Sequence, residues 1–255
     1  MLFVCNGPPK SGTTWVTQFF KFQPTWVQAT PAEFNDPKWS NPKLLTKYLK
    51  DLDSYDFFHK NHFYTKVHLW NNDWAKNMLD NPHVRVLSII RDARDQFVSR
   101  YYHDIKIKEI SADMSFDDYF EGYMDQRIDW VLEYNEFWYG VPGKGPVTTS
   151  YEYLQADVDA ALANFVAALK LPADVTFNIG LIKEKTDFSK FKVTGDGAFM
   201  RKGQVGDHLN HMSKAQVERL EDRLRKGGYG KMKRAIVTLH PYLEPTLTGT
   251  DIGLD

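Results

Sequence analysis

The feature that most constrains the fold is a glycine-containing loop near the start of the chain. An apolar run at residues 2–5 is followed by a segment rich in Gly, Pro and Ser that ends at Gly12. Apolar residues then recur at helical spacing over residues 15–20. A buried strand, a tight loop and a helix in this order direct backbone N–H groups and a helix N-terminus at one point. The segment therefore predicts an anion-binding loop next to a sheet.

This loop differs from the Walker loop of ATPases in the position of its lysine. Gly7 and Gly12 have the Walker spacing, and Thr14 stands at the Ser/Thr position of that motif. Thr13 stands where the Walker lysine belongs, and the lysine of this loop is Lys10. The displacement argues against an ordinary ATPase and favours another phosphate-bearing donor.

Three segments resemble the sulfotransferases that use 3'-phosphoadenylyl sulfate (PAPS), especially the cytosolic type. They read PKSGTTW at residues 9–15, RDARDQFVS at 91–99 and FMRKGQVGD at 199–207. They follow the order of the family's motifs, so the resemblance covers most of the chain. It implies an enzyme that uses PAPS as co-substrate and releases adenosine 3',5'-bisphosphate (PAP).

The resemblance also implies a set of donor-binding residues. A dianionic 3'-phosphate suits a guanidinium and hydroxyl donors, which Arg91 and Ser99 supply. Trp15 is expected to stack on the adenine, and Tyr151 and Thr186 resemble adenine-contacting positions. The full expected set is Lys10, Ser11, Gly12, Thr13, Thr14, Trp15, Arg91, Ser99, Tyr151, Thr186, Phe199, Arg201, Lys202 and Gly203.

Three residues are candidates for catalysis. Negative charge grows on the leaving phosphate during sulfuryl transfer, and Lys10 is the cation expected to stabilise it. His68 is the expected general base, because an ordinary histidine pKa of about 6.5 suits proton transfer at neutral pH. The segment KVHL at residues 66–69 is similar to the family segment that carries the base, and Lys66 is expected to polarise the sulfuryl group. His62 and His103 remain weaker alternatives for the base.

The pattern along the chain predicts an α/β fold. Strands are expected at residues 2–5, 63–69, 84–90 and 146–151, and helices after Trp15, around residues 96–102, at 157–170 and after Ser213, with a turn at residues 227–228. Residues 24–62 are expected to form loops with short helices. Alternating strands and helices indicate a single P-loop-like domain over residues 1–255, with a parallel sheet covered on both faces. Lys10, His68 and Arg91 would then emerge together at the carboxyl ends of the strands.

Bulk properties narrow the classes of partner. A net charge of −1 disfavours a nucleic-acid binder. The single cysteine, Cys5, is expected in the core and excludes an internal disulfide. No signal peptide, membrane helix or metal-ligand cluster is recognisable, so we expect a cytoplasmic protein that uses no metal.

The chain departs from the family pattern in four places. The N-terminal extension of cytosolic members is not seen, which predicts a more open acceptor site. The segment RDARD lacks the common proline, so the shape of its loop is expected to differ mildly. Only Glu218 survives from the family's dimer motif, so that dimer is not expected. His208 stands where the family has tryptophan, and we expect looser packing of this segment.

Two other classes of function stay open beside the sulfotransferase. They are a P-loop nucleotide kinase or hydrolase, and a catalytically silent nucleotide-binding protein. The acceptor is expected to be a small molecule with a hydroxyl or amine group, apolar or aromatic because aromatic residues lie near the predicted site. These residues are Phe63, Tyr64, Trp70, Tyr101, Tyr102 and Phe199.

Overall fold

The computed structural model describes residues 1–23, 26–28, 62–70, 73–171, 177–186 and 203–248. Within these residues the centre is a five-stranded sheet of order β2-β3-β1-β4-β5, and every neighbouring pair is parallel. The strands are β1 (Leu2–Asn6), β2 (Trp26–Gln28), β3 (His62–Val67), β4 (Val84–Ile90) and β5 (Val147–Ser150).

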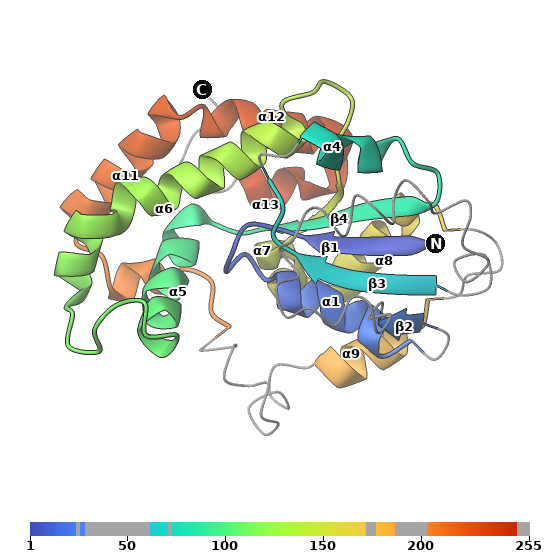
Figure 1. Ribbon diagram of the computed structural model, residues 1–255, viewed down its shortest axis with the longest axis horizontal. Coiled ribbons are helices and arrows are strands. Elements are labelled where there is room, and N and C mark those ends of the chain that lie inside the picture. The colour runs from blue at the N-terminus through green and yellow to red at the C-terminus, as the bar shows by residue number, and fades with distance from the viewer. Residues whose placement is uncertain (24–25, 29–61, 71–72, 172–176, 187–202, 249–255) are drawn as a thin grey trace.

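Helices cover both faces of this sheet, as Figure 1 shows. One face carries α1 (Thr13–Lys21), α7 (Tyr151–Ala156), α8 (Val158–Leu169) and α9 (Ile179–Thr186). The other carries α4 (Asp73–Lys76), α6 (Phe116–Tyr139), α12 (Tyr229–Leu239) and α13 (Glu244–Thr248). Beyond the carboxyl ends of the strands, α5 (Ala93–Lys106) and α11 (Lys214–Lys226) pack on α6. Short 3-10 helices are η3 (Asn77–Leu79), η5 (Asp207–Asn210) and η6 (Pro241–Leu243).

The two-sided burial of β1 explains this layering. Phe3 and Cys5 face the cluster that includes α1 and α8, whereas Leu2 and Val4 face the cluster that includes α6 and α12. Successive side chains of a strand point to opposite faces, so a strand that is apolar at every position needs cover on both.

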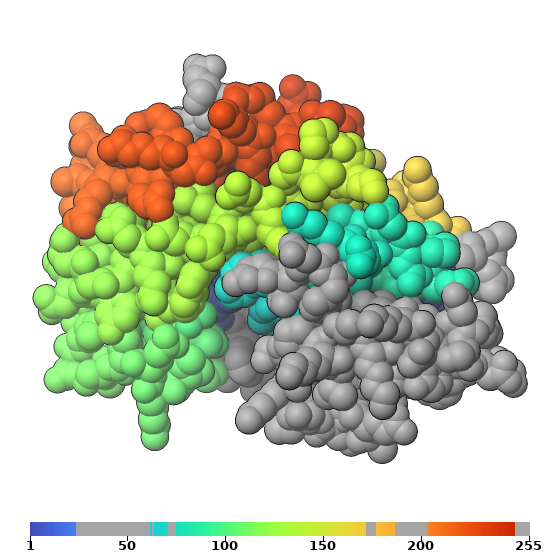
Figure 2. All heavy atoms as spheres, turned by 45° about the horizontal axis from the view of Figure 1, so that its top comes forward, coloured from blue at the N-terminus to red at the C-terminus, as the bar shows by residue number. Residues whose placement is uncertain are grey.

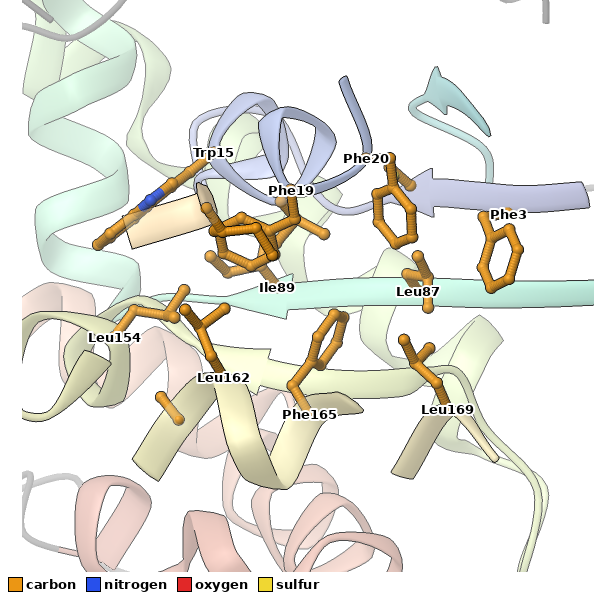
Figure 3. Packing of buried hydrophobic residues seen from close by; sticks show 14 of the residues in the cluster. Phe3, Trp15, Phe19, Phe20, Leu87, Ile89, Leu154, Leu162, Phe165 and Leu169 are labelled. Carbon is orange, nitrogen blue, oxygen red and sulfur yellow. The ribbon is translucent and has the colours of Figure 1, made fainter. Parts of the chain in front are cut away.

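The cluster under α1 is largely aromatic (Figure 3). Phe20 stacks on Phe3 with ring centroids 5.3 Å apart, and Phe19 meets Phe165 of α8 edge-on at 6.2 Å. Trp15 lies at the end of this cluster next to Ile89 and Leu154. The cluster therefore fixes α1 on the sheet and, with it, the loop that precedes α1.

The predicted α/β fold with a parallel sheet is confirmed. β4 has the predicted bounds, α8 fills the predicted helix, and Ser213 and Gln216 form a capping box at α11. One prediction is wrong: Trp26–Gln28 forms the edge strand β2, where loops and short helices were expected. Residues 29–61 lie outside the described part. The 24-residue helix α6 was not among the predicted elements.

None of the helices in the described ranges is both long and apolar enough to cross a membrane. Cys5 is fully buried in the core, as predicted.

Candidate active site

Three neighbouring strands deliver the predicted residues to one edge of the sheet. β3, β1 and β4 are adjacent and parallel, and Asn6 at the end of β1 is in register with Val67 and Ser88. The Asn6 amide accepts from the Leu69 N–H at 2.9 Å and donates to the Leu69 carbonyl at 3.2 Å, which fixes the backbone beside His68. Figure 2 shows the surface hollowed beside green α5 and α6, with blue and cyan atoms from the N-terminal part of the chain at the bottom.

The loop from Gly7 to Gly12 turns sharply into α1. Lys10 and Gly12 have φ angles of 72° and 113°, in the left-handed region. Only glycine adopts the second of these without strain. Ser11 Oγ donates to the Pro8 carbonyl at 2.8 Å, which closes the turn. The loop therefore meets the positive N-terminal end of α1, an arrangement suited to an anion.

Positive charge is concentrated around this loop. Burial and the nearby Lys66, Arg91, Arg100 and Lys106 together lower the pKa of Lys10 to about 8. Burial also lowers the pKa of Lys66, whose Nζ donates to Thr14 Oγ1 at 2.7 Å. Burial and like charges disfavour the protonated form of Lys10, and a polyanion bound beside it would favour that form again.

His68 is held in one tautomer by the loop. Its Nδ1 lies 2.7 Å from the Gly7 carbonyl oxygen, which can only accept, so Nδ1 carries the proton and Nε2 keeps its lone pair. Burial, with the charges of Lys66, Arg100 and Lys10, lowers the pKa of His68 to about 4 even though the Gly7 bond raises it. The ordinary histidine pKa on which the sequence-based choice of His68 rested therefore does not hold, and at neutral pH the ring is an uncharged proton acceptor.

The alternative bases are placed less favourably. His62 stands at the amino end of β3 and its Nδ1 is 3.4 Å from the terminal amine of Met1. With a rise of about 3.3 Å per residue, six residues of extended chain separate it from His68 by roughly 20 Å. His103 lies on α5 with Nδ1 3.6 Å from Asp104 Oδ1.

Arg91 follows β4 directly and is held on two sides. Its Nη2 donates to the Gln204 carbonyl at 3.1 Å, and its guanidinium carbon lies 4.3 Å from the centre of the Tyr151 ring. Tyr151 also meets Trp15 edge-on, with centroids 5.4 Å apart. The Arg91 Nε is buried and has no partner among the described residues. Arg91, Tyr151 and Trp15 therefore form one contiguous group, in which Trp15 is 5% exposed.

The other predicted donor-binding residues are placed as follows. Ser99 is half-buried on α5, and Thr186 is buried at the end of α9, which packs on α1. Gly203 has a φ of 66°. Phe199, Arg201 and Lys202 lie outside the described residues.

The structure adds contacts that the sequence analysis missed. Gln96 Nε2 donates to the Pro9 carbonyl at 2.8 Å and so ties α5 to the loop. Arg100, one helical turn later, acts electrostatically on both Lys10 and His68. Gln96 and Arg100 are four residues apart, a spacing that places them on one helix face. The local sequence does not show which segment that face contacts.

The expectation of looser packing at His208 is wrong. Its side chain is 7% exposed, and Nδ1 lies 2.8 Å from Asp95 Oδ1. A hydrogen bond to a buried carboxylate thus fixes this segment, where the family pattern has tryptophan.

The arrangement of loop, base and cations occurs in a chain that matches a known family. The family model of the sulfotransferase domain matches residues 3–235. The chain belongs to the sulfotransferase family. Sulfotransferase 1C2 of Oryctolagus cuniculus is 25% identical over 253 residues, covering 88% of this chain and 82% of the relative. The 3-beta-hydroxysteroid sulfotransferase of Cavia porcellus is also 25% identical, and the match covers 84% of this chain and 78% of the relative.

Solved sulfotransferase structures share the fold. The mouse sulfotransferase SULT7A1 complexed with PAP has a TM-score of 0.63 and 18% identity, covering 96% of this chain and 88% of its own. A retinol dehydratase in complex with androsterone and inactive cofactor PAP has a TM-score of 0.60 and 18% identity, covering 89% and 80%. Over the described ranges of this sulfotransferase, no three His, Cys, Asp or Glu side chains gather as a metal site.

Proposed function

We propose that this sulfotransferase transfers a sulfuryl group from PAPS to a hydroxyl or amine group of a small acceptor. The observation that carries the proposal is the 2.7 Å contact between His68 Nδ1 and the Gly7 carbonyl. It joins a neutral base to an anion-binding loop whose lysine, Lys10, is close enough to act on that base electrostatically. The proposed base, His68, and the proposed leaving-group cation, Lys10, are thus held next to each other by the same loop.

The residues present fit a polyanionic donor. Burial lowers the pKa of both Lys10 and Lys66, and four nearby cations lower the pKa of Lys10 further. PAPS supplies the sulfuryl group and a phosphate leaving group. A bound anion would raise the pKa of Lys10 again and keep it protonated.

Each residue then has a distinct role. Nε2 of His68 accepts the proton of the acceptor as its oxygen or nitrogen attacks sulfur. Lys10 stabilises the negative charge that develops on the leaving phosphate, where binding is stronger in the transition state than in the ground state. Lys66, held by Thr14, polarises the sulfuryl group.

The 3'-phosphate distinguishes this donor from ATP, and Arg91 is proposed to bind it with Ser99. The unpartnered Nε of Arg91 supports this assignment, because a buried donor without a partner is costly unless a ligand satisfies it. Trp15 and Tyr151 are proposed to hold the adenine. Thr186, Phe199, Arg201, Lys202 and Gly203 keep their proposed donor-binding roles from the sequence.

An apolar or aromatic acceptor stays part of the proposal. The androsterone complex of the retinol dehydratase, a protein of the same fold, supports an acceptor of this kind. The single-domain organisation, the cytoplasmic location and the absence of the family dimer are likewise sequence-based proposals.

His68→Ala tests the catalytic assignment. The variant should lose sulfuryl transfer by about 100-fold or more, since a positioned base contributes about 10²–10⁴ in rate. Binding of PAP should stay within a few-fold of the unchanged protein. The measurements are transfer of radioactive sulfate from PAPS and calorimetric titration with PAP. His103→Ala is the matched control and should keep most activity; full activity in His68→Ala would refute the role of this base.

A donor-preference experiment separates the alternative functions. We expect PAP to bind in the micromolar range and ADP with magnesium to bind weakly. Preference for magnesium–ADP would instead favour a P-loop kinase or hydrolase. PAP binding without transfer to any acceptor would favour a catalytically silent protein.

A further inference from the structure

The segment from Gly203 to His208 is joined to α5 by one carboxylate. Asp95, on the first turn of α5, accepts from the Gly206 N–H at 2.7 Å and from the His208 N–H at 2.9 Å. Nδ1 of the His208 ring lies 2.8 Å from the same carboxylate. The Asp95 side chain has no exposed surface. Three partners on one segment therefore satisfy a fully buried charge.

The same carboxylate lies beside Arg91. Its Oδ2 is 3.9 Å from Arg91 Nη2, and this Nη2 donates to the Gln204 carbonyl at 3.1 Å. Asp95 and Gln204 thus contact Arg91 together, although residue 204 is more than 100 positions away in the chain. Removal of the carboxylate would release the segment and one side of Arg91 at the same time.

His208 stands where the family pattern has tryptophan, and it contributes two of the three contacts to Asp95. The His208 ring and its backbone N–H both reach Asp95 Oδ1, at 2.8 Å and 2.9 Å. Gly206 has a φ of 77°, so the backbone turns back towards α5 at this point. The turn places two N–H groups within reach of one carboxylate.

We propose that Asp95 is a positioning residue for the 3'-phosphate site. It holds the Gly203–His208 segment against α5 and aligns Arg91 with it, so that both are in place before the nucleotide binds. The inference rests on the proposed use of PAPS, because it concerns the 3'-phosphate that Arg91 is proposed to bind.

Discrimination between nucleotides tests this role. Asp95→Ala should weaken binding of PAP about 10- to 100-fold, since hydrogen bonds to a charged group are lost and Arg91 is no longer aligned. Adenosine 5'-monophosphate, which has no 3'-phosphate, should bind with nearly unchanged affinity. The preference for PAP over the monophosphate should therefore fall by the same factor, as measured by calorimetric titration of both nucleotides.

Asp104→Asn provides the matched control. Asp104 is another fully buried carboxylate of α5, and it contacts Arg100 of α5 and Arg127 and Tyr119 of α6 instead of residues 203–208. This variant should lower the midpoint of thermal unfolding and keep the preference for PAP. A loss of preference in both variants would show that any damage to α5 has this effect, and would overturn the proposal.

Asp95→Asn is the second variant if Asp95→Ala does not fold. The amide oxygen can still accept, but its charge is gone, so an intermediate loss of preference is expected. Hydrogen–deuterium exchange should show faster exchange at Gly206 and His208 in either variant. Unchanged preference in a folded variant would overturn the proposal, whereas failure of the unchanged protein to bind PAP would refute the proposed function itself.

Discussion

The surroundings of Lys10 disfavour its protonated form. Burial and four other cations lower its pKa to about 8, so a large fraction of the free protein holds a neutral Lys10 at pH 9. The proposed donor is anionic and binds the protonated form. Binding therefore takes up a proton above pH 8, and affinity must fall as the pH rises through this value.

Lys10→Arg isolates this effect. In the unchanged protein the dissociation constant of PAP should rise above pH 8, by up to about tenfold per pH unit. An arginine cannot lose its proton in this range, so the variant should show a much flatter profile. Calorimetric titrations at pH 7.0, 8.0 and 9.0 provide the comparison. Equal slopes for both proteins would assign the pH dependence to another group, such as Lys66.

Single residues were predictable where the chemistry lies in a contiguous segment. Lys10, His68 and Arg91 were each found from a local pattern, and the structure brings their strand ends to one edge. Asp95 and Gln96 could not be found in this way, because each is recognised only by its contact with a segment distant in the sequence. The role of each site residue in the reaction stays a prediction.

At the scale of the element, the turn into α1 depends on Gly12. Its φ of 113° is strained for any L side chain. A Cβ there would lie 2.9 Å from Ile89 Cδ1 and 3.1 Å from Tyr151 Cδ2. The turn between β1 and α1 is thus limited both by backbone conformation and by its packing against β4 and α7.

Gly12→Ala and Gly122→Ala should change stability in opposite directions. The first should lower the free energy of unfolding by about 1–3 kcal/mol and weaken PAP binding. Gly122 is an exposed residue of α6, and no atom beyond its chain neighbours and its own helix backbone lies within 4 Å of an added Cβ, so alanine there should raise stability by about 0.5–1 kcal/mol. Urea unfolding of both variants tests this pair. Two destabilised variants would contradict the conformational argument.

Elements were predictable in proportion to the strength of their local signal. β4 is dense in β-branched residues, and α11 begins with a capping box, so both were found. β2 has only three residues, and its pairing with β3 makes it a strand. α6 is amphipathic only weakly, because it contacts the sheet, α5, α11 and α12 on different sides.

At the scale of the whole molecule, two carboxylates meet where the segment between β4 and α5 packs on the start of α7. Glu152 Oε1 accepts from the Asp92 N–H at 2.9 Å. Burial raises the pKa of Glu152 to about 7, and the negative charge of Asp92 contributes to the rise. Asp92 keeps a lowered pKa because Arg94 binds it. One partner of this pair therefore holds its proton near neutral pH.

This raised pKa makes stability fall with rising pH. Between the ordinary value of 4.5 and about 7, the folded chain binds more protons at Glu152 than the unfolded chain does. Ionisation of this group therefore reduces the free energy of unfolding in that window. Glu152→Gln keeps an acceptor for the Asp92 N–H and removes the ionisation. Its gain in stability over the unchanged protein should be about 2 kcal/mol larger at pH 8 than at pH 5.

Urea unfolding at the two pH values measures this difference. Glu133→Gln, at an exposed position of α6, is the control and should shift stability little at either pH. An equal gain for Glu152→Gln at both pH values would show that ionisation of Glu152 does not oppose folding. A gain confined to pH 8 would instead show that the contact between the start of α5 and α7 keeps a carboxylate beside Arg91 at a cost to the stability of the whole chain.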